Sequence, residues 1–313
     1  MTAKRPSFAF DRDGIWMLLA LGILAAAVTI PAFRDPVNLA NVVRQAGVLG
    51  ILAVGQTFVI TAGMLDLSIG MIAGLVVVLS SAMINGEAAL TLPVAALMLL
   101  IGGGIGLLNG ALLNALRLHP LILTFGMMSI LQGAIFTYTD RSVGRTSDLL
   151  GTLANGSVLG VPYAGLLLLA LAFGAHLLFA RTSFGYHLVA VGGNAESARR
   201  AGISVERVRL SVFVISGLTA AMAGLLLAGR LGTGYPLAGS GLELDAIVAV
   251  VLGGTALSGG RGSIARSLAG VFMLAIISNV LNLLEVSAFV QMFVKGLIVI
   301  LAILLNQPRR AGP

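Results

Sequence analysis

Long apolar segments separated by short polar ones fill most of this chain of 313 residues. Ten of these segments approach the length of about 20 apolar residues that a helix needs to cross a bilayer. The pattern predicts an all-α fold, a polytopic transmembrane helix bundle, in one integral membrane domain over residues 1–313. We expect about ten spans, with nine or eleven as alternatives, over roughly 15–33, 46–65, 69–84, 92–116, 120–138, 162–180, 210–229, 242–258, 264–282 and 287–306.

The junction between the second and third segments places Asp66 between two glycines, Gly63 and Gly70, inside an apolar stretch. This pattern predicts a broken or re-entrant helix, which a membrane tolerates where unwound backbone lines a cavity or is covered by protein. A short echo of the same pattern, Glu243-Leu244-Asp245, occurs in the second half of the chain. Paired interrupted segments can mark an internal repeat, although three residues are a short match.

The distribution of charge indicates how the chain is oriented. Only 10% of the residues are charged, and the formal net charge is +7. In a soluble protein this charge would favour nucleic-acid binding, but basic residues of membrane proteins gather on cytoplasmic loops. If the N-terminus is inside, 13 of the 19 basic residues fall on predicted inner segments, five on outer ones and Lys295 in the last span. The N-terminal tail 1–14, the loop 181–209 and the C-terminal tail 307–313 are then cytoplasmic.

The first apolar segment, 15–30, follows basic residues and has a cleavable signal peptide as its competing interpretation. No small-residue cleavage site precedes Arg34, and many spans follow, so a retained first span is favoured.

Catalytic and metal chemistry find no support. Cysteine is absent, which excludes disulfides, thiolate zinc sites and a thiol nucleophile. The three histidines, His119, His176 and His187, have no second ligand at metal spacing. No nucleophile–base set stands out, so we expect no catalytic residue, no metal and no cofactor.

The loop 181–209 is the only long charged stretch, and it contains a short helix whose two ends are marked. Asn194 is a good N-cap, and Gly202 suits the left-handed position after the helix. Charges of the sign that suits the helix dipole lie in the first and last turns, namely Glu196, Arg199 and Arg200. Because two turns of helix are marginal alone in water, this helix must dock on its own bundle, on lipid headgroups or in a groove of a cytoplasmic partner.

Four motifs follow one another across nearly the whole chain. They lie at residues 59–70 (VITAGMLDLSIG), 120–129 (PLILTFGMMS), 192–203 (GGNAESARRAGI) and 243–263, where ELDAIVAVVLGGT is followed by SGGRGS. In these motifs the chain resembles the permeases of sugar-type ABC importers, the family of ribose, xylose and autoinducer uptake systems. One departure is Ala62-Gly63-Met64, where the family more often has two glycines and an isoleucine.

The resemblance implies a homo- or heterodimer with a second permease copy in the bacterial inner membrane, two cytoplasmic ABC ATPase subunits and a periplasmic sugar-binding protein. The chain has no Gly-x-x-x-x-Gly-Lys-Ser/Thr motif of its own, so the energy of ATP must arrive through contact. The residues that the resemblance assigns to coupling with the ATPase are Gly193, Asn194, Glu196, Ala198, Arg199, Arg200 and Gly202.

Polar residues within the spans are candidates for a translocation path, because a hydroxyl-rich solute requires hydrogen-bonding partners. Most such groups bridge helices, so a minority is expected to face the path. The candidates are Gln56, Thr61, Asp66, Ser68, Asn109, Ser129, Gln132, Asp245 and Asn279. Because a charge within the bilayer is costly, we also expect Lys295 to pair with Asp66 or Asp245.

The leading prediction is a permease subunit that imports a small sugar, a pentose, hexose or related polyol, and contacts lipid but no nucleic acid. One alternative is a branched-chain amino-acid permease of the same broad family. Another is a secondary transporter in which Asp66 or Asp245 carries a proton or sodium ion.

Overall fold

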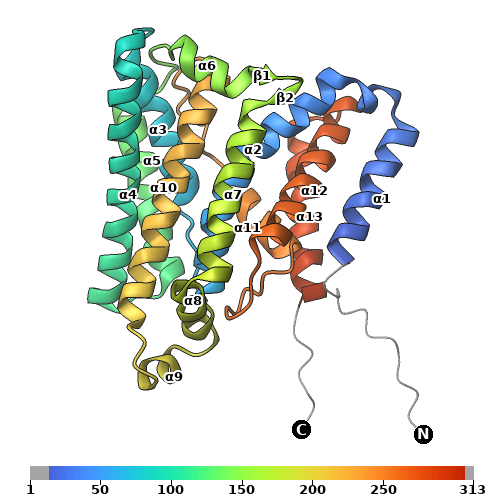
Figure 1. The fold of residues 1–313 in the computed structure, drawn as a ribbon. Coiled ribbons are helices and arrows are strands. Elements are labelled where there is room, and N and C mark those ends of the chain that lie inside the picture. The colour runs from blue at the N-terminus through green and yellow to red at the C-terminus, as the bar shows by residue number, and fades with distance from the viewer. Residues whose placement is uncertain (1–13, 307–313) are drawn as a thin grey trace, which may run out of the picture.

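The computed structural model describes residues 14–306 of the chain. The expected tails 1–14 and 307–313 lie outside this range, apart from Gly14. The described residues form an all-α bundle with one small two-stranded hairpin (Figure 1). Its elements are α1 (Gly14–Thr29), η1 (Pro31–Arg34), α2 (Pro36–Thr61), α3 (Ile69–Ile84), η2 (Ala88–Leu90), α4 (Thr91–Leu116), α5 (Pro120–Tyr138), α6 (Asp148–Asn155), β1 (Ser157–Val158), β2 (Val161–Pro162), α7 (Tyr163–Arg181), α8 (Ser183–Gly193), α9 (Ala195–Arg200), α10 (Val205–Leu231), α11 (Leu242–Leu252), α12 (Ile264–Leu283) and α13 (Ala288–Asn306).

Six helices of the described part are long and apolar enough to cross a membrane: α2, α4 with η2 before it, α5, α7, α10 and α12. The helices α1 and α3 have 16 residues each and fall below that length. The all-α polytopic bundle is therefore confirmed, whereas the number of ten spans stays a prediction.

The segment 242–258, expected as one span, is a shorter helix followed by loop. Helix α11 has 11 residues, which is about 16 Å at 1.5 Å per residue and half the thickness of a hydrocarbon core. It ends at Gly253, and Gly254 then adopts a φ of +81°. The loop that follows packs against the end of α2, where the backbone N–H of Gly260 donates to the carbonyl of Thr61 at 2.9 Å. A full span is replaced here by a half-length helix and a buried turn.

The predicted break in the chain near Asp66 is present. Helix α2 ends at Thr61, α3 begins at Ile69, and residues 62–68 between them are not helical. The second interrupted segment meets the first, because a Cβ atom placed on Gly74 of α3 would lie 3.3 Å from the Cα atom of Gly239, just before α11. The two segments that echo each other in sequence therefore lie side by side in the bundle.

Helix α10 is central, and glycines allow α4 to pack closely against it. Cβ atoms placed on Gly102, Gly106 and Gly110 would collide with α10; for Gly110 the nearest atom is the Cα of Leu210, at 2.8 Å. These three glycines, spaced four residues apart, therefore serve helix packing.

The two ends of the bundle differ (Figure 1). Helices α8 and α9 lie at one end, toward which the first turn of α1 and the last turn of α13 also point, while α6 and the β1–β2 hairpin lie at the other. Three of these elements, α6, the hairpin and α8, were not anticipated from the sequence. Helix α8 has a recognisable signal, since Phe184, Leu188 and Val191 follow helical spacing and are buried or half-buried on one face.

Candidate functional site

Helix α9 has both of the predicted caps. The side chain of Asn194 accepts a hydrogen bond from the backbone N–H of Ser197 at 2.8 Å. At the other end Gly202 has a φ of +84°, the left-handed conformation that glycine adopts without strain. The predicted set also contains Gly193, which precedes the helix, and Ala198, which lies within it and is buried against the bundle. The sequence therefore fixes the position and length of this helix.

The charged groups of α9 tie it to the base of the long helix α10. Arg199 forms an ion pair with Glu206 in the first turn of α10 and a longer one, at 3.6 Å, with Glu196. Arg200 pairs with Glu196 at 3.2 Å. The hydrogen bond to Glu206 raises the pKa of the Arg199 guanidinium above its ordinary value. Because all four side chains are exposed, these contacts orient α9 more than they stabilise the fold.

Helix α10 is also joined to α4 at this level. The amide of Asn114 donates to the backbone carbonyl of Glu206 at 2.9 Å. Glu206 of α10 therefore links two neighbours: α9 through the side chain of Arg199, and α4 through the amide of Asn114.

The end of α8 lies directly against the broken helix. A Cβ atom on Gly192 would collide with the carbonyl oxygen of Thr61, the last residue of α2. Phe184 of α8 packs on Phe58 of α2, with ring centroids 6.1 Å apart. The segment that carries α9 is thus in contact with the helix break.

Asp66 is fully buried at the break, and its carboxylate is satisfied by hydrogen bonds. One oxygen accepts from the backbone N–H of Ser68 at 2.9 Å and from the Ser68 hydroxyl at 2.6 Å, and the other accepts from the Ser216 hydroxyl of α10 at 2.7 Å. Asn109 of α4 donates to the same Ser68 hydroxyl at 3.0 Å. These contacts favour a structural role for Asp66, since three donors stabilise the buried charge.

Other candidates of the translocation path lie apart from this cluster. Thr61 is buried and bonds to the carbonyl of Thr57. Ser129 and Gln132 are on α5, where Ser129 is exposed and Gln132 half-buried. Asn279 forms a reciprocal pair with Asn38, at 2.7 and 3.0 Å. The structure therefore brings together Asp66, Ser68 and Asn109, and leaves the rest dispersed.

Gln56 is fully buried in α2, and neither atom of its amide has a hydrogen-bond partner among the described residues. The same holds for one carboxylate oxygen of Glu243, which packs on Gly70. A buried polar atom without a partner is costly. At these two side chains, as at several other buried polar atoms of the described residues, water or another conformation must supply a partner.

The expected ion pair of Lys295 is present, with Asp245 as its partner. The ammonium nitrogen lies 2.7 Å from a carboxylate oxygen, and both side chains are about three-quarters buried. The pair joins α13 to the first turn of α11.

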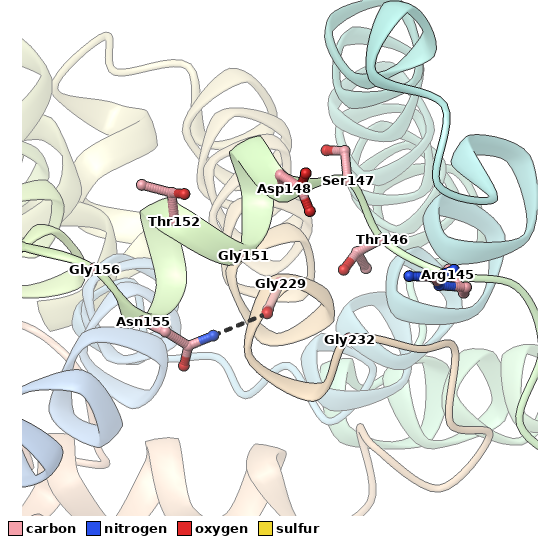
Figure 2. Close-up of a pocket in the computed structure, with 10 residues that line it drawn as sticks. All are labelled: Arg145, Thr146, Ser147, Asp148, Gly151, Thr152, Asn155, Gly156, Gly229 and Gly232. Carbon is pink, nitrogen blue, oxygen red and sulfur yellow. Dashed lines mark hydrogen bonds between the residues drawn. The ribbon is translucent and has the colours of Figure 1, made fainter.

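An open polar cleft of about 630 Å³ lies at the end of the bundle opposite α9. Figure 2 shows it between α6 and the last turn of α10, with hydroxyl, amide and charged side chains around a floor of glycines. The amide of Asn155 donates to the carbonyl of Gly229 at 3.2 Å and closes one side. The sequence does not predict this cleft, because most of its residues lie between the predicted spans 120–138 and 162–180.

Among the described residues, no three His, Asp or Glu side chains gather at metal-binding distance. Sequence reasoning also missed Ser216 and Glu206. Neither has a local signal, because each acquires its role from a partner on another helix.

Comparison with known proteins gives a consistent result. The family described as "Branched-chain amino acid transport system / permease component" matches residues 38–303. The ribose import permease protein RbsC of Bacillus subtilis (strain 168) is 40% identical over 98% of this chain and 97% of its own length. RbsC of Escherichia coli (strain K12) is 37% identical, over 94% and 93%, and the L-arabinose ABC transporter permease protein AraH of Azospirillum brasilense is 35% identical, over 96% and 88%. No solved structure matches the chain.

Proposed function

The chain belongs to the family of binding-protein-dependent permease components that the match over residues 38–303 defines, and on that premise we propose that it is the membrane permease subunit of an ATP-driven ABC importer for a small sugar. The observation that carries the proposal is the similarity to a ribose import permease, 40% identical over nearly the full length of both chains. Relatives that are named for ribose and arabinose support a monosaccharide as the solute.

The subunit is a transport component and not an enzyme, because its relatives are permeases. ATP hydrolysis belongs to a separate cytoplasmic subunit, which binds α9. The predicted set around this helix supports that role, because all of its members except the buried Ala198 are exposed: Gly193, Asn194, Glu196, Ala198, Arg199, Arg200 and Gly202. A push on α9 is transmitted through the Arg199–Glu206 pair to α10, and Ser216 of α10 holds the helix break at Asp66. Coupling thus runs along one rigid helix from the ATPase contact to the middle of the bundle.

The remaining partners follow from the two ends of the molecule. A periplasmic sugar-binding protein docks at the end that carries α6 and the polar cleft of Figure 2. A second permease copy completes the translocation path in the bacterial inner membrane, with the termini on the cytoplasmic side. Thr61 and the Asp66–Ser68–Asn109 cluster are the path candidates at the helix break, because Thr61 ends α2, Asp66 and Ser68 lie within the break, and Asn109 of α4 bonds to Ser68.

A branched-chain amino acid is the alternative solute, since the family description names it. A zwitterion requires, for its ammonium group, a carboxylate whose charge is not already neutralised by a partner. The carboxylate of Asp245 is already paired with Lys295, and that of Asp66 accepts three hydrogen bonds. The same two pairings oppose the role of either aspartate as the carrier of a driving ion.

Uptake by the reconstituted system tests the proposal. The permease is combined in proteoliposomes with its ATPase and binding protein from the neighbouring genes, and uptake of radiolabelled D-ribose and L-arabinose is measured with and without internal ATP. We expect ATP-dependent sugar uptake. Uptake of L-leucine in place of sugar, or sugar uptake by the permease alone on an ion gradient, would contradict the proposal.

A further inference from the structure

A partly open cavity of about 150 Å³ lies among α2, α10, α11, α12 and α13. Gln45 lies nine residues into α2, and Lys295 seven residues into α13. At 1.5 Å per residue these positions are about 10 to 14 Å below the end of the bundle that carries α6. The last turn of α10 separates the cavity from the open cleft of Figure 2, with Arg230 on the cavity side and Gly229 on the cleft side.

The lining of the cavity has the composition of a small-molecule site. Apolar side chains from α2, α10, α11 and α12 form its walls, and five polar side chains converge on it from five helices. Such a wall with a few placed polar groups is typical of ligand pockets. The polar residues are Gln45, Arg230, Asp245, Ser278 and Lys295.

Most of the hydrogen-bonding capacity of these groups is unused within residues 14–306. Neither Gln45 nor Ser278 makes a side-chain hydrogen bond, and Arg230 has no carboxylate within ion-pair distance. Asp245 uses one carboxylate oxygen for Lys295 and leaves the other available. Ser278 is buried, Gln45, Asp245 and Lys295 are partly buried, and Arg230 is exposed at the rim, so an occupant meets these groups as it leaves bulk water.

We propose that this cavity is a transit site for one monosaccharide, an inference that rests on the proposed function and names a site for its solute. A cavity of about 150 Å³ has room for a solute of the size of one sugar ring. Sugar hydroxyls donate to the free oxygen of Asp245 and accept from Arg230, while the amide of Gln45 does both. The Asp245–Lys295 pair fixes the orientation of its two charges before the sugar arrives.

The absence of native cysteine allows a direct binding test on the permease alone. Ser278→Cys places a single thiol in the cavity, and Ser157→Cys places one on the exposed hairpin as the matched control. Each purified full chain in lipid nanodiscs is labelled with a small methanethiosulfonate reagent, with and without D-ribose. Labelling of the cavity thiol is expected to slow about twofold when D-ribose equals its Kd and about tenfold at ten times that concentration, with no change in the control. Unchanged labelling of Ser278→Cys, or protection by L-leucine or inorganic phosphate and not by D-ribose, overturns the proposal.

A second test separates this site from the importer function itself. Ala275→Leu fills the cavity from α12, and Ala265→Leu adds the same volume at an exposed position of the same helix. Gln45→Leu removes an amide that has no partner in the fold. In the reconstituted importer, Ala275→Leu and Gln45→Leu are expected to lower D-ribose uptake per ATP hydrolysed by at least about threefold, the effect of one lost hydrogen bond, and to change the D-ribose to L-arabinose ratio. If wild type imports no sugar, the proposed function fails; if wild type and both variants import sugar alike, only the transit site fails.

Discussion

The hydroxyl of Ser216 donates a 2.7 Å hydrogen bond to the carboxylate of Asp66, 150 residues earlier in the chain. Both side chains are fully buried. Ser216 lies near the middle of α10, whose first turn carries Glu206, the partner of Arg199 on α9. One helix therefore joins the exposed helix α9 to the interruption between α2 and α3.

Ser216→Ala is expected to destabilise the permease in detergent by about 1.5–3 kcal/mol, because it removes a hydrogen bond to a buried charge. Thermal unfolding followed by size-exclusion chromatography measures the loss. The comparison variant is Ser211→Ala, a partly buried hydroxyl of the same helix with no side-chain hydrogen bond to another described residue.

A double-mutant cycle with Asp66→Asn separates this contact from general packing. The two substitutions are expected to be less than additive, since each removes the same charge-assisted hydrogen bond. Strict additivity would show that the Asp66–Ser216 contact does not stabilise the break.

Gly106→Ala is expected to destabilise the bundle by about 1–3 kcal/mol, because its Cβ atom would collide with the carbonyl oxygen of Phe213 on α10. Gly104→Ala is the matched control on the same helix, where no atom lies within 4 Å of the added Cβ. Thermal stability of the two variants in detergent decides the point, and equal stability would refute the close packing of α4 on α10.

Much of this architecture is predictable because membrane helices carry strong local signals. Apolar runs located the long helices, and Asn194 with Gly202 located both ends of α9. The pairing of Lys295 followed from the cost of a single charge in the bilayer.

The rest depended on contacts between distant segments, which spacing does not encode. Nothing in the local sequence marks Ser216 as the partner of Asp66. The length of α11 is set by Gly253, Gly254 and the packing of the following loop on Thr61. The predicted loop 181–209 includes residues 183–193, which form helix α8, although the spacing of Leu188 and Val191 is that of one helical face. The cavity near Asp245 is formed by five helices and has no signature in any one of them.

Glu206→Arg is expected to lower sugar uptake while ATP hydrolysis continues, because Arg199 then faces a like charge and α9 loses its link to α10. The double variant Arg199→Glu with Glu206→Arg restores the pair and is expected to recover part of the uptake. The ratio of sugar imported to ATP hydrolysed in proteoliposomes is the readout. A ratio unchanged in Glu206→Arg would remove this pair from the coupling path.

Gly202→Val is expected to uncouple the importer in the same assay, because a β-branched residue is strained at a φ of +84°. Gly202→Asn is the control at the same position, since asparagine tolerates the left-handed conformation. Glu196→Lys tests the electrostatic side of the same helix, where Glu196 pairs with both Arg199 and Arg200. Normal coupling in both Gly202→Val and Glu196→Lys would show that α9 is not the ATPase contact.

Asp245→Lys and Lys295→Asp are each expected to reduce thermal stability, since each leaves two like charges in a mostly buried place. The double reversal is expected to recover most of that stability, as measured by the temperature of unfolding in detergent. Uptake is not expected to return with it, because the reversed pair presents its carboxylate from α13 instead of α11. Recovery of stability without uptake thus distinguishes a transit site from a purely structural ion pair.

Ser197→Cys on α9 and Ser157→Cys on the β1–β2 hairpin are expected to lie on opposite sides of the membrane. The excess of basic residues on the α9 side predicts that this side is cytoplasmic, and α9 and the β1–β2 hairpin lie at opposite ends of the bundle in Figure 1. Each thiol is the only one in its chain, because the native sequence has none. A membrane-impermeant maleimide applied to intact cells should label Ser157→Cys, and Ser197→Cys should react only after the inner membrane is opened. Labelling of Ser197→Cys from outside would place α9 beyond the reach of a cytoplasmic ATPase and would leave the chain without a source of energy for import.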